Sequence, residues 1–173
     1  MTHELLDVVD NDDQIIDRRL RADIHANGLR HRAVHILVFN DDGLLFLQKR
    51  SMNKDLNKGL WDTSAAGHVD AGESYDDCAP RELREELGVW AELERLFKLT
   101  ANPELGMEFI QVYRCQHNGP FELAAEEIDE GRWLHPEELD KRLAADDPSL
   151  TLTFKIIWQH YRDADWQHSK PGA

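Results

Sequence analysis

The most informative segment of this chain, Gly67 to Val89, reads GHVDAGESYDDCAPRELREELGV. Its second half is densely charged and contains Glu82, Glu85 and Glu86. Because an α-helix turns once every 3.6 residues, these carboxylates project from one side within about one turn. Like charges at such spacing cost roughly 0.2–0.5 kcal/mol per pair. The cluster therefore needs a compensating partner, and we expect a divalent cation.

Glycines and a capping residue predict a loop, a helix and a second loop in this segment. Gly67 and Gly72 permit backbone conformations and close approaches that a Cβ would block. Ser74 stands where a helix N-cap belongs, ahead of two aspartates that suit the helix dipole. Pro80 predicts a shortened first turn or a kink, since proline removes an intrahelical donor. Gly88 is expected to end the helix in a left-handed cap.

The spacing of the segment is Gly, five residues, Glu, seven residues, then Arg-Glu-apolar-X-Glu-Glu-X-Gly-apolar. This pattern resembles the signature of the Nudix hydrolases, whereas the ELREEL run alone would fit a solvated helix face of alternating charge. The resemblance implies binding of Mg²⁺ or Mn²⁺ and hydrolysis of a diphosphate linked to another group. It also implies an α/β fold, a Nudix-type α/β/α sandwich on a mixed sheet.

The family pattern assigns roles within the segment. It makes Glu85 and Glu86 direct metal ligands, Glu82 a ligand or a water-orienting base, and the Gly67 carbonyl a further ligand. Mg²⁺ usually takes one or two protein carboxylates, and substrate phosphates and waters complete its shell. The resemblance therefore implies a metal site shared between protein and substrate.

Three further residues of the motif have supporting roles in this pattern. Glu73 and Gly88 are structural positions. Arg81 is expected to pair with Glu73 or another motif carboxylate rather than with substrate, because its guanidinium suits a bidentate clamp.

The catalytic base is open at this stage. Glu82 is one candidate, and Glu127 or Glu130 in the downstream stretch EEIDEGRW are the others. That stretch is similar to the acid-rich segment before a tryptophan in many relatives, with Trp133 as the match. It would equally fit a solvated acidic turn.

The stretch HRAVHILVFNDDGLLFLQKRSMNK, followed by GLWDTSAAGH, resembles the Nudix branch that includes isopentenyl diphosphate isomerases and their hydrolase relatives. The branch implies that Arg50 and Lys54 bind the substrate's diphosphate; otherwise they are ordinary surface charges. The isomerases carry a catalytic cysteine before the Gly-His pair, where this chain has Ala66, whose methyl cannot transfer a proton. We expect hydrolysis, with an isomerase-like enzyme and a non-catalytic diphosphate sensor as alternatives.

The isomerases also bind a metal through a histidine cluster. His31 and His68 fall on matching positions, His25 is offset in spacing, and Glu108 matches a carboxylate of the same site. Isolated histidines are more often surface or hydrogen-bonded core residues, so a second metal site stays open.

Length and charge set the remaining limits. With 173 residues, we expect a single domain over 1–173, with an N-terminal hairpin and short helix in 1–28 and the motif in 67–89. The net charge of −14 argues against a nucleic-acid polymer as partner, but not against a small diphosphate, because bound cations invert the local charge. The absence of an apolar span or a signal-like N-terminus favours a cytoplasmic protein without a membrane partner. A homodimer is an open alternative.

Patterns of hydrophobicity and turn residues predict the other elements. We expect a hairpin over 5–16, a short helix over 18–27, a hairpin of strands over 31–39 and 44–48, strands over 61–66, 93–100, 108–115 and 132–134, and helices over 137–144 and 150–163.

Overall fold

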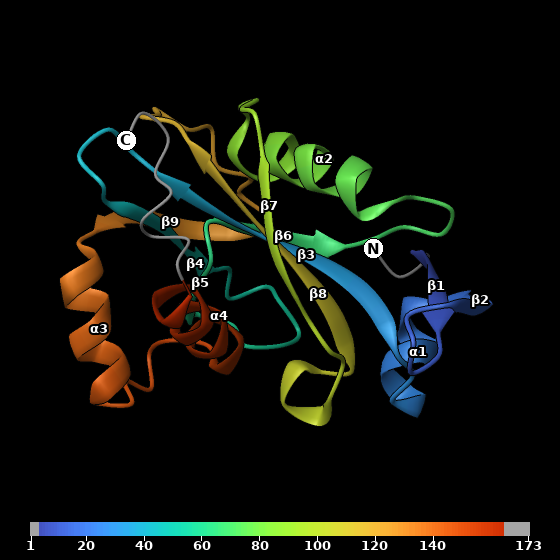
Figure 1. Ribbon diagram of the computed structural model, residues 1–173. Coiled ribbons are helices and arrows are strands. Elements are labelled where there is room, and N and C mark those ends of the chain that lie inside the picture. Colours follow the sequence, from blue (N-terminus) through green and yellow to red (C-terminus); the bar gives the residue numbers. More distant parts are fainter. Residues whose placement is uncertain (1–3, 165–173) are drawn as a thin grey trace.

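A seven-stranded sheet with helices on both faces forms the centre of the molecule (Figure 1). The computed structural model describes residues 4–164, so the ends of the expected 1–173 domain lie outside the described residues. The elements in chain order are β1 (Leu5–Val9), β2 (Ile15–Leu20), α1 (Arg21–Asn27), β3 (His31–Phe39), β4 (Leu45–Arg50), β5 (Trp61–Asp62), β6 (Ala65–His68), α2 (Tyr75–Leu87), β7 (Glu94–Leu99), the 3₁₀ helix η1 (Pro103–Leu105), β8 (Glu108–Gln116), β9 (Ile128–Leu134), α3 (Pro136–Ala144) and α4 (Leu152–Asp163).

The large sheet is mixed. Its strands run in the order β5-β4-β3-β8-β7, with β6 also paired to β3 and β9 also paired to β4. β3 and β8 are parallel, from His31 opposite Glu108 to Phe39 opposite Gln116, and the other pairs are antiparallel. β1 and β2 form a separate two-stranded sheet, as the expected hairpin requires.

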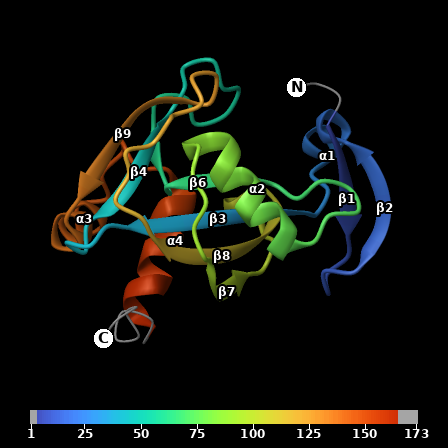
Figure 2. The same cartoon turned by 90° about the horizontal axis from the view of Figure 1, so that it is seen from above.

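Two hydrophobic layers hold helices against the two faces of the large sheet (Figures 1 and 2). Val34, Ile36 and Val38 of β3 pack with the buried side of α2, while Leu37 packs with α4. A central strand buried on both faces needs apolar residues at nearly every position, which explains the apolar run of β3. The expected α/β/α sandwich is confirmed. None of the helices among residues 4–164 is long and apolar enough to cross a membrane.

The expected hairpin between residues 31–39 and 44–48 is wrong in its pairing. The two strands share only the pair Phe39 and Leu45. β3 is flanked by β8 and β6 instead, and β4 is flanked by β9 and β5. A local turn signal cannot show that distant strands take the hydrogen-bonding sites of a central strand.

The expected strand over 61–66 is two short strands. β5 pairs with β4, and after Thr63 and Ser64 the chain enters β6, which pairs with β3. Ser64 bridges the gap where β3 and β4 part: its Oγ accepts a hydrogen bond from the Val38 amide (2.8 Å) and donates one to the Phe46 carbonyl (2.5 Å). This crossing places the loop after β6 beside α2.

Two boundaries differ from expectation because of strand pairing. The first helix begins at Arg21 rather than Arg18, since residues up to Leu20 pair with β1. β9 begins at Ile128 rather than Arg132, because it follows β4 for longer than its short apolar run indicates.

Candidate active site

The motif helix α2 begins and ends as its sequence predicts. The Ser74 hydroxyl accepts a hydrogen bond from the Asp77 amide (3.1 Å), and Gly88 closes the helix with a left-handed φ of 71°. Pro80 lies inside the helix, which runs from Tyr75 to Leu87. One side of the helix packs on the sheet, and this orientation buries Glu82 and Glu86.

Gly67 and Glu82 lie in direct contact. A Cβ built on Gly67 would lie 2.1 Å from the Glu82 carboxyl carbon, far inside van der Waals contact. The glutamate therefore rests on bare backbone, and its carboxylate lies beside the loop that follows β6. This close approach explains the glycine at position 67.

Arg81 clamps the carboxylates of the motif together. It donates to both oxygens of Glu73 (2.7 and 2.8 Å), and its Nη1 donates to Glu82 (3.0 Å) and Glu85 (3.2 Å). The hydrogen bonds to Glu73 raise the pKa of the guanidinium further above its already high value. Arg81 thus pairs within the motif, as expected from its bidentate geometry.

Glu86 is buried, and one of its oxygens is held twice. Its Oε1 accepts from the Ala66 amide and from Gln48 Nε2, both at 3.0 Å. Burial raises the pKa of Glu86 to about 7. Burial, and next the charge of Glu86, raise the pKa of Glu82 to about 8. Both carboxylates are therefore costly to ionise together without a neighbouring cation, and hard oxygen donors suit Mg²⁺ or Mn²⁺.

The downstream candidate Glu127 lies beside the motif and is paired. It accepts a hydrogen bond from Lys54 Nζ. After burial and the hydrogen bonds from Ala66 and Gln48, the charge of Glu127 raises the pKa of Glu86 and the charge of Lys54 lowers it. Arg50, the other expected diphosphate ligand, lies 3.8 Å from the Asp62 carboxylate, with its Nε donating to a loop carbonyl.

Glu130 is not brought to the motif. Gln48 points toward α2, and Lys49, the next residue of β4, is paired in register with Glu130. Because successive side chains of a strand point to opposite faces, Glu130 points away from α2. Its carboxylate accepts from Arg132 (3.0 Å).

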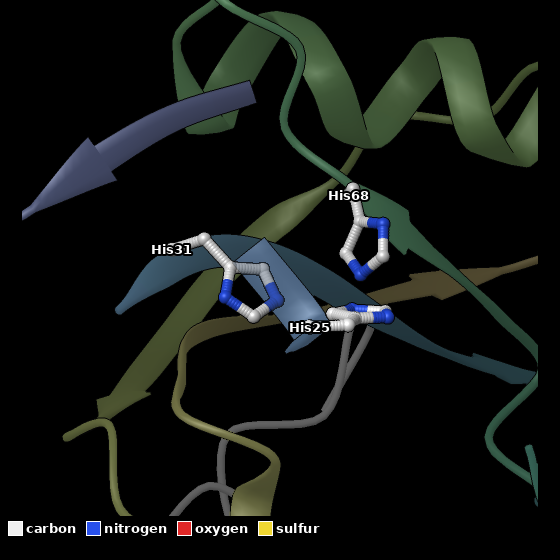
Figure 3. Close-up of side chains that lie close together, drawn as sticks. All are labelled: His25, His31 and His68. Carbon is white, nitrogen blue, oxygen red and sulfur yellow. The ribbon is translucent and has the colours of Figure 1, made fainter. Parts of the chain in front are cut away.

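The candidate histidines converge from three elements. His25 of α1, His31 of β3 and His68 of β6 have ring centroids 5.2 to 5.5 Å apart, and Figure 3 shows the rings facing one another. One ring nitrogen from each lies within 4.8 Å of the others. Glu108 joins them, with Oε2 3.0 Å from His68 Nε2 and 3.5 Å from His31 Nε2.

The cluster contains a buried nitrogen without a hydrogen-bond partner. Among the described residues, His31 Nε2 makes no hydrogen bond, while its Nδ1 lies 2.9 Å from the Leu29 carbonyl. A neutral ring that donates from Nδ1 presents a lone pair at Nε2, which is the form that binds metals. Burial would lower the pKa of His68, but its hydrogen bond to Glu108 and its ion pair with Glu4 outweigh it and raise the pKa to about 9.

Two polar residues beside these sites escaped the sequence analysis. Gln48 lies on β4, 38 residues before Glu86 in the sequence, and contacts it in the fold. The one signal of this contact in the sequence is that Gln48 shares a face of β4 with Phe46, two residues earlier. Glu4 lies 3.7 Å from His68 Nδ1, and nothing in the sequence indicates that contact.

Comparisons with known proteins agree with this geometry. A family model described as the NUDIX domain matches residues 29–154. An uncharacterized Nudix hydrolase of Yersinia pestis is 36% identical over 143 residues, covering 80% of this chain and 77% of that protein. An isopentenyl-diphosphate Delta-isomerase of Serratia proteamaculans is 33% identical over 159 residues, covering 89% of each chain.

A solved structure shares the whole architecture. The crystal structure of DR0079 from Deinococcus radiodurans matches with a TM-score of 0.80 and 29% identity, over 91% of this chain and 98% of that one. The family match covers most of the chain and includes the loop, helix and loop that carry the clustered glutamates. The chain therefore belongs to the Nudix hydrolase family, enzymes that act on pyrophosphate bonds, and is similar to its isopentenyl diphosphate isomerase branch.

Proposed function

We propose that this chain hydrolyses the diphosphate bond of a nucleoside diphosphate derivative or a related small molecule, with Mg²⁺ as cofactor and Mn²⁺ as an alternative. The observation that carries the proposal is the pair of buried carboxylates, Glu82 and Glu86, whose pKa values are raised to about 8 and about 7. Buried carboxyls of this kind are favourable in their ionised form only beside a compensating cation, and Nudix hydrolases generally use divalent metals.

We assign the metal ligands to Glu82, Glu85, Glu86 and the Gly67 carbonyl. These donors are all oxygens, which fits the preference of Mg²⁺ and Mn²⁺. A cation held by these residues would neutralise charge on the phosphoryl oxygens in the transition state. Arg81 keeps two of these ligands, Glu82 and Glu85, in place and is itself anchored by Glu73.

The protein groups around the ligands orient substrate and move a proton. Lys54 and Arg50 bind the diphosphate oxygens, and Lys54 exchanges its contact with Glu127 for the substrate. Water attacks phosphorus, its proton passes to a carboxylate, and the P–O bond breaks with its electron pair on the departing phosphate. Glu82 and Glu127 are the candidate bases, because each is near Glu86, whereas Glu130 points away.

A second metal site is proposed at His25, His31, His68 and Glu108. Its support is the buried Nε2 of His31, which makes no hydrogen bond within residues 4–164 and lies among converging ring nitrogens. Imidazole nitrogens with one carboxylate suit Zn²⁺ or Mn²⁺ better than Mg²⁺. This site lies at the junction of α1 and the sheet, so its contribution is structural or to substrate binding.

The proposed hydrolysis is tested by a substrate screen. Nucleoside di- and triphosphates, sugar nucleotides, dinucleoside cofactors and prenyl diphosphates are incubated with Mg²⁺ or Mn²⁺, and phosphate release is measured. Glu86→Gln should abolish most of the turnover at saturating Mg²⁺ with the fold intact. The matched control Glu104→Gln changes an exposed glutamate far from α2 and should retain activity. Full activity of Glu86→Gln would contradict the proposal.

The same screen separates the alternatives. Double-bond migration of isopentenyl diphosphate without phosphate release would favour an isomerase working with Ala66 in place of cysteine. Tight binding of a diphosphate compound without turnover under either metal would favour a sensor. If Ala66→Cys gains isomerase activity, the site retains isomerase geometry.

A further inference from the structure

A buried glutamine joins the strand β4 to the motif helix. Gln48 is 4% exposed, and its Nε2 donates to the Ser64 carbonyl (3.2 Å) and to Glu86 Oε1 (3.0 Å). Both partners are acceptors, so the amide nitrogen, rather than the amide oxygen, must face them. The two N–H groups of the amide are thereby both used.

The position of Gln48 is one where an apolar residue would be expected. Its neighbour on the same face of β4, Phe46, lies in the hydrophobic layer beneath α2. An amide buried there is unfavourable unless its hydrogen bonds are made. Ser64 supplies one partner from the crossing between β5 and β6, and the second partner is the carboxylate of a proposed metal ligand. Gln48 therefore links Ser64, which lies where β3 and β4 separate, to the proposed metal site.

We propose that Gln48 is a positioning residue for the metal-binding carboxylate of Glu86. Together with the Ala66 amide, it occupies Oε1 and fixes the carboxylate plane, which leaves Oε2 for the cation. Among residues 4–164, no hydrogen bond is made to Oε2. Outer-shell partners of this kind orient ligands and tune metal affinity. The inference rests on the proposed metal site on α2, but it does not depend on which substrate is hydrolysed.

The chain offers a matched control in Gln111. This glutamine is 2% exposed on β8, and its Nε2 also makes two hydrogen bonds, to the carbonyls of Phe97 (3.0 Å) and Val112 (3.3 Å). Within residues 4–164, its amide hydrogen-bonds to backbone carbonyls and to no motif carboxylate. Gln48→Leu and Gln111→Leu therefore remove the same number of buried hydrogen bonds, and only the first change reaches Glu86.

The test is a Mn²⁺ titration without substrate, in which free Mn²⁺ is measured by its electron paramagnetic resonance signal. The binding class in question is the one that Glu86→Gln removes, which keeps it apart from the histidine cluster. Gln48→Leu should raise the Kd of this class by about 10- to 100-fold. Gln111→Leu should change this Kd by less than about twofold. Both glutamine variants should lower Tm by a similar amount. In the Glu86→Gln background, Gln48→Leu should leave the remaining Mn²⁺ binding unchanged.

Each contrary outcome has a distinct meaning. An unchanged Kd in Gln48→Leu, an equal rise in both glutamine variants, or no such binding class in the natural sequence overturns the positioning role. A loss of the remaining Mn²⁺ binding when Gln48→Leu is added to Glu86→Gln also overturns it, since Gln48 would then act elsewhere. Normal Mn²⁺ binding with no turnover of any compound would contradict the proposed hydrolysis and leave the Gln48 assignment intact.

Discussion

At the scale of single residues, Gly67 sets the position of Glu82. An alanine Cβ at this position would lie 2.1 Å from the Glu82 carboxyl carbon. The obstructing atoms belong to a flexible side chain, so we expect the fold to survive and the carboxylate to move. A displacement of about 1 Å at a catalytic group can cost about 100-fold in rate. Gly67→Ala should lower kcat/KM by that order, with Tm reduced by no more than about 4 °C.

Two measurements separate displacement of the Glu82 carboxylate from unfolding of the protein. Calorimetry gives Tm, and a Mg²⁺ titration of activity shows whether more metal compensates. Retention of kcat/KM within about threefold would show that Glu82 does not need its contact with Gly67.

The raised pKa values of Glu82 and Glu86 predict a pH-dependent metal affinity. Without metal, these carboxyls have pKa values of about 8 and about 7, so near neutral pH Glu82 is largely protonated and Glu86 is about half protonated. A cation must displace these protons, and its affinity should rise from pH 6 to pH 9, by up to about tenfold per pH unit for each displaced proton. Mn²⁺ titrations across this range measure the slope. Glu82→Gln should flatten the rise near pH 8, and an unchanged slope would contradict the assignment.

The metal-free protein should show the opposite trend in stability. The folded state holds these two protons more tightly than an unfolded chain, whose glutamates have a pKa of 4.5. The unfolded state loses its protons first, so these groups destabilise the fold as the pH rises from 4.5 toward 8.

At the scale of elements, Asp13 fastens the N-terminal hairpin to the sheet and the motif helix. Its carboxylate accepts from Arg32 (2.7 Å), Tyr75 (2.8 Å) and Lys98 (2.7 Å). Burial would raise the pKa of Asp13, but the hydrogen bonds from Lys98, Arg32 and Tyr75 lower it below 3.8. A lowered carboxyl pKa stabilises the fold above 3.8, and this contribution is lost as the pH falls through the folded value.

Asp13→Asn tests this fastening with little change of shape. Asparagine tolerates the left-handed φ of 61° at this position, so the backbone need not adjust. The variant should lose about 2 kcal/mol of unfolding free energy at pH 7, as charged hydrogen bonds are removed, and less at pH 3. Urea unfolding at both pH values is the measurement, with Asp12→Asn in the same turn as control. An equal loss of unfolding free energy at both pH values would exclude a stabilising role for the charge of Asp13.

The elements also show which contacts a sequence can reveal. Glu73, Arg81, Glu82 and Glu86 lie within fourteen residues, and helical geometry alone brings the last two together. The contact of Gln48 with Glu86 depends instead on the separation of β3 from β4 and the crossing at Ser64. These long-range pairings replace a hairpin that local turn chemistry favours. Alternation along β4, which turns a glutamine inward, was the one trace of them in the sequence.

At the scale of the whole molecule, the histidine cluster joins parts of the chain that are distant in sequence. His25 comes from α1, His31 and Glu108 begin the two parallel central strands, and His68 ends β6. The sequence could suggest three of these positions through a family resemblance. His25 could be aligned only once the length of α1 and the αL cap at Gly28 were known, because both set the direction of the helix.

A metal at this cluster should stabilise the entire fold. A ligand that binds only the folded state adds about 2.7 kcal/mol at 100 times its Kd, equivalent to roughly 5–11 °C in Tm for a chain of this size. Zn²⁺ should therefore raise the Tm of the natural sequence by that order and leave the Tm of His31→Ala unchanged. His160→Ala changes an exposed histidine on α4 and should respond as the natural sequence does.

The pH dependence of this stabilisation distinguishes ligation from unspecific binding. The His68 pKa of about 9 lies above the value of 6.5 for an unfolded histidine, so its pairing with Glu108 and Glu4 stabilises the metal-free fold fully below pH 6.5 and is lost as the pH rises through 9. Zn²⁺ must displace the His68 proton, so its effect on Tm should be larger at pH 8 than at pH 6. Equal shifts at both pH values, or a shift that persists in His31→Ala, would show that the added metal binds elsewhere.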